Sequence, residues 1–390
     1  MATVFDYLKW RGDLSFAQDP LNPVDGLIFC ALSYIPFVGQ AAETPNEPIA
    51  LRDAAADFLS LDDYESRVRA KNDAMMLRAA AETARFGGCK MVLYRDQFAP
   101  EEETQFAAMT FLLPDDTAFV AFRGTDRSLV GWKENLNLSF MDAVPAQTGA
   151  VAYVEDMARH CPDRPLRIGG HSKGGNLAAY AALHIDGALQ RTRLLDAYNN
   201  DGPGFRKDVT DTEEYRRVAA KLHTYIPASS IVGVLLEHTE DYTVVASSSR
   251  AIMQHEPLTW GVLGSRFIRQ EARSEFGKAS DDVVREWLAS LSPQERKEFS
   301  NALFDMFTQG GTVQSLEDVR QSELLKRLAA DEKQRGIVSE ALRRLMADVK
   351  DELLRTAEAG LKETAETLKE TAGNLYQAGQ KALERRKEEK

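Results

Sequence analysis

Residues 168–179 read Ile-Gly-Gly-His-Ser-Lys-Gly-Gly-Asn-Leu-Ala-Ala, and they carry more information about the fold than any other stretch of this chain. Within them, Gly170-His171-Ser172-Lys173-Gly174 has the Gly-x-Ser-x-Gly spacing of a nucleophile elbow, a sharp strand-to-helix turn that holds a serine hydroxyl in the open. The apolar run 166–168 before it is typical of a strand, and the Ala- and Leu-rich run 176–183 after it is typical of a helix. A glycine-rich turn with an incidental serine is the alternative, and the strand–helix context favours the elbow.

Strand and helix signals alternate on both sides of this turn. Apolar, β-branched and aromatic runs predict the strands, and apolar faces at helical spacing predict the helices. Pro114-Asp115-Asp116 is a turn that predicts a hairpin, and Pro20, Pro23 and Pro36 are expected to break regular structure near the N-terminus. Such alternation predicts an α/β fold with a mostly parallel sheet covered on both faces. We expect strands at 91–94, 105–113, 118–123, 166–168, 194–199, 222–226 and 241–247, and helices at 54–59, 64–86, 151–160, 176–183 and 212–221.

The strand signal ends near residue 275, and only helical patterns follow. We therefore predict three regions: an α/β domain over 1–275, a helical extension over 276–345, and an amphipathic helical tail over 346–390. Leucines in the tail recur every seven residues, which is typical of a coiled coil. Its last forty residues hold eight basic and nine acidic side chains, so the tail lacks the strong positive face of an anionic-lipid binder. Self-association as a homo-oligomer, or packing, is favoured, ahead of a solvated tail and of contact with a membrane surface. The expected helices after 275 are 283–291, 293–307, 316–328 and 336–353, and the heptad leucines are Leu354, Leu361, Leu368 and Leu375.

Composition excludes several classes of partner. The net charge of −12 leaves no basic stripe for nucleic acid. Cys30, Cys89 and Cys161 are odd in number and widely spaced, so neither a disulfide framework nor a zinc site is expected. No apolar stretch approaches the 18 residues or so that a transmembrane helix needs, and the charged N-terminus does not read as a signal peptide. We expect a cytoplasmic protein without metal or cofactor.

A serine at an elbow needs a histidine base, and chain order narrows the choice of base. In hydrolases with this turn the order along the chain is serine, acid, histidine, which leaves four of the six histidines. His184 is too close in sequence to fold back onto Ser172, and His223 opens a predicted strand. His255 follows the last expected strand, where a base should lie, and His238 is the alternative.

The oxyanion formed during acyl transfer needs two backbone N–H donors. One belongs to the residue after the nucleophile, here Lys173, and the other to a loop after an early strand. The segment 122–126, Phe-Arg-Gly-Thr-Asp, closes an expected strand and fits that place. A plain turn held by Asp126 is the alternative, and Arg123 and Asp126 could pair to brace the loop. A serine–lysine mechanism through Lys173 is disfavoured because the side chain after an elbow serine normally points away.

Two motifs together resemble a known family. The pairing of Ala-Phe-Arg-Gly-Thr at 121–125 with Gly-His-Ser-Lys-Gly-Gly-Asn-Leu-Ala at 170–178 is similar to the class 3 lipases of the α/β-hydrolase fold. More closely, the chain resembles the bacterial Mbeg1-like family of lipase-like proteins over roughly residues 3–265. The resemblance implies an α/β-hydrolase fold, a Ser172 nucleophile, a His255 base and an oxyanion donor at Thr125. Further matching stretches are 6–14, 200–205, 227–236 and 254–255.

The sequence departs from the class 3 lipases at the acid of the triad. The resemblance implies an aspartate in an Asp-x-Val-Pro segment after the next-to-last strand, but Ser230 stands there in this chain. Asp201 follows the preceding strand, 194–199, in a rigid Asp-Gly-Pro-Gly context, and other lipases of the fold place their acid after that strand. A turn aspartate that caps its own backbone is the alternative reading. Asp241 and Glu237 are weaker substitutes for the acid.

These residues predict a serine esterase or lipase-like hydrolase acting on a carboxylic ester, such as a small-molecule or lipid ester. Ser172 would be the nucleophile, His255 the base, Asp201 the orienting acid, and Lys173 and Thr125 the oxyanion donors. Two alternatives follow from the missing Asp-x-Val-Pro acid and from the tail. One is a non-catalytic protein that binds an acyl ligand or a protein partner, and the other is an interaction protein assembled through its tail.

Overall fold

The computed structural model describes residues 1–308 except 127, 207, 208, 231, 235, 237 and 239. The described chain falls into two compact units, one of residues 1–126 and 143–274 and one of 127–142 and 275–308. The second unit thus includes a segment, 127–142, that the sequence pattern did not single out. The helices expected at 316–328 and 336–353 and the heptad tail lie outside the described residues.

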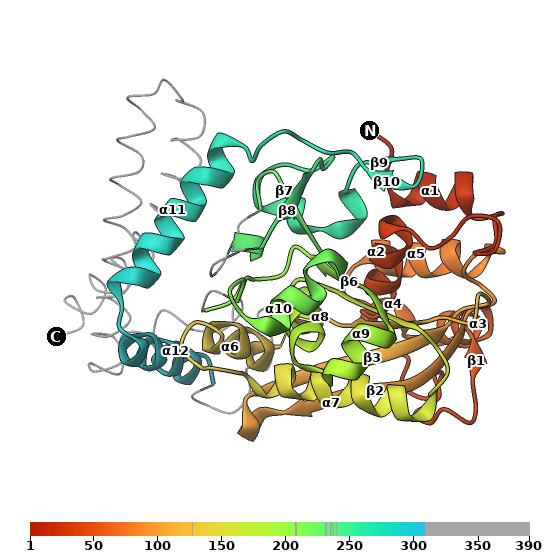
Figure 1. Cartoon of the computed structure of the whole chain (residues 1–390), viewed down its shortest axis with the longest axis horizontal. Coiled ribbons are helices and arrows are strands. Elements are labelled where there is room, and N and C mark those ends of the chain that lie inside the picture. Colours follow the sequence, from red (N-terminus) through yellow and green to blue (C-terminus); the bar gives the residue numbers. More distant parts are fainter. Residues whose placement is uncertain are drawn as a thin grey trace. The chain divides into compact units, whose positions relative to one another are not determined.

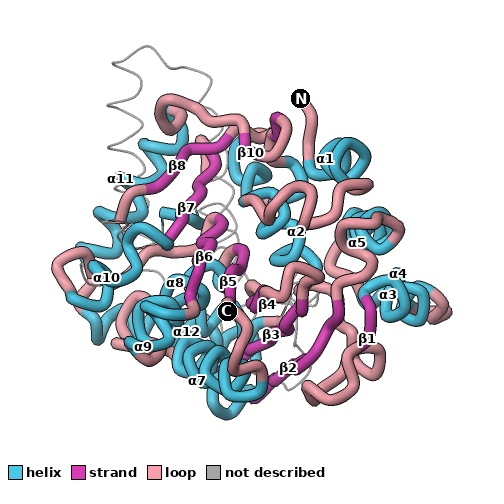
Figure 2. The backbone as a smooth tube through the Cα atoms, turned by 45° about the vertical axis from the view of Figure 1, so that its right-hand side comes forward, coloured by secondary structure: helices cyan, strands magenta, loops and turns pink. Residues whose placement is uncertain are grey.

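An eight-stranded sheet forms the centre of the first unit (Figure 2). Its strands lie in chain order from β1 to β8. Pairing is antiparallel from β1 to β4 and parallel from β4 to β8, so the fold is α/β, as predicted. A separate hairpin joins β9 and β10. The strands are β1 (Ile49–Ala50), β2 (Lys90–Ala99), β3 (Thr104–Leu112), β4 (Ala118–Phe122), β5 (Leu166–His171), β6 (Leu194–Asn200), β7 (Leu222–Pro227), β8 (Tyr242–Val245), β9 (Val262–Leu263) and β10 (Arg266–Phe267).

Helices cover both faces of this sheet (Figures 1 and 2). Helix α2 packs on β4, β5 and β6 from one side, while α7 and α8 pack on β3, β5 and β6 from the other. The central strands are therefore buried on both faces over most of their length. The helices of the first unit are α1 (Val4–Arg11), α2 (Pro23–Leu32), α3 (Leu51–Leu59), α4 (Tyr64–Arg67), α5 (Lys71–Ala81), α7 (Pro145–His160), α8 (Lys173–His184), α9 (Gly187–Thr192) and α10 (Glu213–Val218).

Each expected strand overlaps an observed one, and the predicted hairpin joins β3 and β4. One helix prediction and one expected break in regular structure were wrong. The helix expected over 64–86 is divided into α4 and α5, because Val68 between them has extended backbone angles, φ −81° and ψ 149°. Pro23 does not break structure but begins α2, where its missing N–H costs nothing, and the Asn22 side chain accepts from the N–H groups of Val24 and Asp25.

The second unit contains α6 (Leu129–Asn137), α11 (Glu275–Ser290) and α12 (Pro293–Thr308). Helix α12 packs against α6. Arg296 Nη1 donates to the Ser139 carbonyl at 2.8 Å, and Ser300 Oγ donates to Asn137 Oδ1 at 3.2 Å. These bonds tie two segments that are far apart in sequence. No helix in either unit, as far as the chain is described, has the length and apolar character to cross a bilayer.

Candidate active site

Ser172 occupies a strained turn between β5 and α8. Its backbone angles are φ 59° and ψ −133°, a conformation that costs energy for a residue with a side chain. The chain folds back so tightly that a Cβ on Gly170 would lie 2.0 Å from the Gly174 carbonyl oxygen, so this position accepts only glycine. The serine is mostly covered, with 8% of its surface exposed. The strand and helix on either side therefore hold Ser172 at the carboxyl end of β5.

Asp201 and His255 meet beside this turn. His255 Nδ1 lies 2.6 Å from Asp201 Oδ2, although the two residues are 54 positions apart. Asp201 directly follows β6, and its N–H donates to the Tyr225 carbonyl of β7 at 2.8 Å. The aspartate is fully buried, whereas 22% of the His255 side chain is exposed. A neutral His255 that donates from Nδ1 keeps the lone pair of Nε2 available to take up a proton.

Ser230 also contacts this aspartate. Its hydroxyl donates to Asp201 Oδ2 at 2.8 Å and accepts from the Gly233 N–H at 3.1 Å. Ser230, at the position where the resemblance implied an aspartate, thus donates a hydrogen bond to the aspartate that follows the neighbouring strand. Asp201 Oδ2 accepts two hydrogen bonds, and the departure seen in the sequence has a direct structural counterpart.

The loop that carries Asp201 is fixed onto helix α8. Asn176, near the start of α8, donates from Nδ2 to the carbonyls of Pro203 and Gly204 at 3.1 and 3.0 Å. Its Oδ1 accepts from Gln147 Nε2 of α7 at 2.8 Å. These bonds couple the loop after β6 to the helix that follows Ser172, so the serine and the aspartate share one rigid support.

The segment 122–126 lies against the same turn. A Cβ on Gly124 would come within 2.5 Å of the His171 carbonyl oxygen and 3.1 Å of Ser172 Cβ, so only glycine allows this approach. Arg123 supports the segment through Asp96, at 2.8 and 2.9 Å, and through Asp126 at 3.6 Å. Burial by itself lowers the pKa of the Arg123 guanidinium, but these two carboxylates raise it above its ordinary value. The backbone of Gly124, the residue before Thr125, thus lies against Ser172.

Lys173 begins helix α8, so its backbone N–H lies at the helix N-terminus beside Ser172. Its side chain is fully buried and donates from Nζ to the carbonyl and side-chain oxygens of Gln105, at 2.5 and 3.1 Å. The ammonium group is therefore bonded to strand β3. This contact gives no support to a serine–lysine mechanism, which the sequence already disfavoured.

The alternative bases and acids make other contacts. His238 is turned toward Glu240, with Nδ1 2.7 Å from Oε1, and its Nε2 lies 3.2 Å from the Gly202 carbonyl. Asp241 is exposed ahead of β8. His223 is half-buried in β7 and hydrogen-bonds Asp196 at 2.9 Å. Glu237 lies outside the described residues.

Sequence reasoning missed two side chains at this site. His171 is fully buried and lies between its neighbours Tyr34 and His255. Tyr34 comes from the segment after α2, 137 residues before His171, so no local pattern could reveal the contact. The histidine at the second position of the Gly-x-Ser-x-Gly motif was the available signal.

One link between the gathered residues is open. Among the described residues, no hydrogen bond joins Ser172 Oγ to His255, and no cluster of three or more metal-ligand side chains is present.

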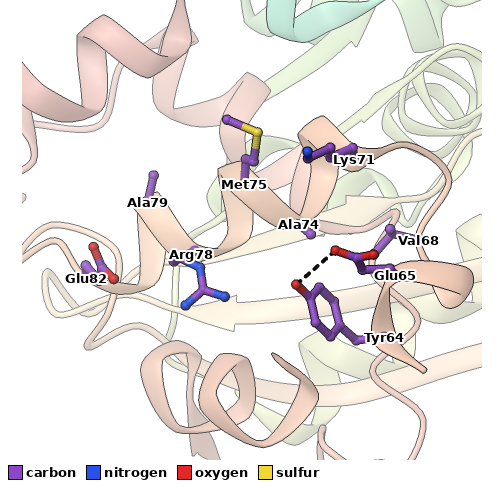
Figure 3. A pocket seen from close by; sticks show the side chains of 9 residues that line it. All are labelled: Tyr64, Glu65, Val68, Lys71, Ala74, Met75, Arg78, Ala79 and Glu82. Atoms are coloured by element: carbon purple, nitrogen blue, oxygen red, sulfur yellow. Dashed lines mark hydrogen bonds between the residues drawn. The ribbon is translucent and has the colours of Figure 1, made fainter. Parts of the chain in front are cut away.

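A pocket of about 420 Å³ on the surface of α4 and α5 is a separate feature (Figure 3). Tyr64, Lys71, Met75 and Arg78 are among the residues that line it, and none of the candidate site residues does.

Fold and site define an α/β protein in which a serine, a histidine and an aspartate gather at the carboxyl ends of parallel strands. The model of the Mbeg1-like family matches residues 80–305, more than half of the chain, and the chain therefore belongs to the Mbeg1-like family. Among solved structures, the native propeptide complex of the Rhizomucor miehei lipase is similar at 14% identity, with a TM-score of 0.37, over 61% of this chain and 81% of that one. No curated protein matches the sequence.

Proposed function

We propose that this protein is a serine hydrolase of the α/β-hydrolase type that cleaves carboxylic esters through an acyl-enzyme on Ser172. The observation that carries the proposal is the 2.6 Å hydrogen bond between His255 Nδ1 and the buried Asp201, beside a serine held in a strained turn. Such a pairing fixes the imidazole tautomer that a general base needs. No metal or cofactor enters the reaction.

In the first half of the reaction, Ser172 Oγ bonds to the ester carbonyl carbon while its proton passes to His255 Nε2. The carbonyl oxygen becomes an oxyanion, which the N–H groups of Lys173 and Thr125 stabilise. The tetrahedral intermediate then expels the alcohol, which takes the proton from His255. Asp201 stays ionised throughout and stabilises the transient imidazolium.

In the second half, water attacks the acyl-enzyme. His255 removes a proton from the water as its oxygen bonds to the acyl carbon, and it then returns that proton to Ser172 Oγ as the acid leaves. The low exposure of Ser172 and the open link to His255 describe the resting state. Catalytic hydrogen bonds commonly tighten only when substrate is bound.

The role of Ser230 weakens the non-catalytic alternative. That alternative rests on the missing acid of the Asp-x-Val-Pro segment. With Asp201 bonded to both His255 and Ser230, an acid is available at the site from the neighbouring strand. The choice between a lipid and a small-molecule ester depends on the alcohol and acyl groups that the site accepts.

Labelling with a fluorophosphonate probe tests the proposal. We expect wild type to be labelled, and Ser172→Ala and His255→Ala to lose labelling. Ser66→Ala and His184→Ala, at exposed positions away from the site, serve as matched controls and should label like wild type. Hydrolysis of p-nitrophenyl esters from acetate to palmitate then distinguishes an esterase from a lipase preference. A folded wild type without labelling, or equal labelling of Ser172→Ala, would remove the proposal.

A further inference from the structure

His171 directly precedes the proposed nucleophile in the chain, and its ring lies beside the proposed base. It is the last residue of β5, it directly precedes Ser172, and its side chain is fully buried. Its ring centroid lies 4.6 Å from that of His255, and the planes are tilted by 35°. No step of the proposed reaction uses this ring, so its place beside the base calls for another explanation.

The partners of His171 define its protonation. Nε2 lies 2.7 Å from the backbone carbonyl oxygen of His255, and a carbonyl can only accept, so Nε2 carries a hydrogen. Nδ1 lies 2.9 Å from the hydroxyl of Tyr34. Burial lowers the pKa of His171 well below its ordinary value of 6.5, and the nearby His255 and Arg69 side chains lower it further. The ring is therefore neutral, and its Nδ1 accepts the hydrogen bond from Tyr34.

A second layer of contacts holds Tyr34 and the residue after His255. The Arg69 guanidinium lies over the Tyr34 ring, 4.5 Å from its centroid. The same guanidinium pairs with Glu256 at 2.9 Å and with Asp73 at 3.2 Å. Arg69 thus fixes both the tyrosine that bonds His171 and the neighbour of His255. Two contacts therefore hold the backbone of His255. One is the bond from His171 to its carbonyl, and the other is the ion pair of the next residue, Glu256, with Arg69.

The neutrality of His171 suits a base beside it. During acyl transfer His255 becomes an imidazolium, and a second positive charge at 4.6 Å would oppose that step. A neutral imidazole donates one hydrogen bond to the backbone of the base and adds no charge. A lysine or arginine at this position would donate equally well but would disfavour the protonated base.

We propose that His171 is a positioning residue: through its Nε2–H bond to the His255 carbonyl, it holds the base in line with Asp201 and Ser172. Tyr34 assists by fixing the tautomer of His171. This inference rests on the proposed function and deepens it, because it assigns a role to the residue before the serine. It also explains how the segment around His255, 84 residues after His171 in the sequence, is held beside the turn at Ser172.

Three variants test the inference. His171→Leu removes the donor. His171→Gln places an amide nitrogen at about the position of Nε2 and keeps it. Tyr34→Phe removes only the hydroxyl that fixes the tautomer. We expect kcat on a p-nitrophenyl ester to fall about 100-fold in His171→Leu, with KM little changed, because misplacing a catalytic group has an effect of that order. His171→Gln should recover most of the loss, and Tyr34→Phe should show a smaller loss.

Hydrogen–deuterium exchange of the segment 254–260 provides a readout that needs no activity. Exchange should be faster in His171→Leu than in wild type and close to wild type in His171→Gln, with urea midpoints confirming that all variants are folded. A folded His171→Leu with wild-type kcat and unchanged exchange would overturn the inference, as would equal loss of kcat in the Gln and Leu variants. A wild type without activity or labelling would overturn the proposed function, and with it the role of His171 in catalysis. The exchange data would then test only whether the His171–His255 hydrogen bond holds the segment 254–260 in place.

Discussion

Two histidine–carboxylate pairs are built from opposite ends of strand β6. Asp196, near its start, hydrogen-bonds His223 with 2.9 Å between Oδ1 and Nε2. Asp201, just past its end, hydrogen-bonds His255 with 2.6 Å between Oδ2 and Nδ1. The two bonds are of the same chemical kind and similar length, yet only the second is placed beside the turn that carries Ser172.

Burial and position separate the pairs. Asp201 is fully buried at the carboxyl end of the parallel strands, where Ser172 also lies. Asp196 is 28% exposed and shares its charge with Arg167, whose Nε lies 3.0 Å away. In open α/β sheets, ligands bind outside the carboxyl ends of the strands. Both pairs have a short histidine–carboxylate bond, so the proposed catalytic role of Asp201 and His255 depends on their place in the sheet.

The two pairs should differ most in how strongly substitution of their histidines lowers kcat. We expect His255→Gln to lower kcat by about 10⁴- to 10⁶-fold, because loss of the base alone can remove most of the triad's effect. His223→Gln should change kcat by no more than about twofold, because His223 pairs with Asp196 at the opposite end of β6 from Asp201. Steady-state hydrolysis of a p-nitrophenyl ester measures both. Comparable losses in the two variants would mean that position in the sheet does not distinguish the pairs.

The carboxylates should show the next largest contrast. Asp201→Asn keeps the shape of the side chain but can present an amide to His255 Nδ1, which favours the wrong tautomer and should lower kcat by about 10⁴-fold. Asp196→Asn is the matched control on the same strand and should leave kcat within about twofold of wild type. Fluorophosphonate labelling rates should follow the same order. Wild-type labelling by Asp201→Asn would point to a dyad that needs no acid.

Much of the fold was predictable because its strands are buried on both faces. The run that became β4, Ala-Phe-Val-Ala-Phe, is continuous and apolar, whereas β6 and β7 carry polar residues among apolar ones and are buried over most of their length. The candidate nucleophile was local in sequence, since the turn needs glycines at fixed spacing. The resemblance to lipases and the order of strands along the chain favoured Asp201 as the acid and His255 as the base. Asp241, Glu237 and His238 stayed open as alternatives, and the roles remain proposals.

The remaining features depend on tertiary contacts that leave no local pattern. Tyr34 reaches His171 across 137 residues, and nothing in the segment around Pro36 indicates it. The function of Ser230 as a donor could not be deduced, because in sequence it reads only as a lost acid. Helix α6 was missed because its sequence, Leu-Val-Gly-Trp-Lys-Glu-Asn-Leu-Asn, has a glycine and two asparagines, which are weak helix formers.

Ser230 offers a smaller test of what surrounds the buried pair. Ser230→Ala removes one of the two hydrogen bonds that Asp201 Oδ2 accepts. Loss of a bond to a buried carboxylate should lower the free energy of unfolding by about 1.5–3 kcal/mol. We expect kcat to fall only several-fold, because the bond to His255 remains. Urea unfolding and ester hydrolysis measure the two effects, and Ser229→Ala, whose hydroxyl bonds Ser274 instead, is the neighbouring control.

The smallest expected effect concerns the exposed pair and its pH dependence. Burial by itself raises the pKa of Asp196, but the hydrogen bonds and positive charges of His223 and Arg167 outweigh it and lower the pKa below its ordinary value of 3.8. The folded state therefore releases this proton more readily than the unfolded state, so the pair contributes stability above about pH 4 that is lost as the pH falls below it. A partly exposed pair contributes at most about 1 kcal/mol.

Asp196→Asn should therefore unfold at a slightly lower urea concentration than wild type at pH 6, and the two midpoints should converge as the pH is lowered toward 3. Thr192→Ala, at an exposed position just before β6, is the control and should show no such convergence. A constant difference between wild type and Asp196→Asn at every pH would contradict the ionic origin of the contribution. The effect would then come from packing, and the two ends of β6 would differ in the kind of interaction as well as in position.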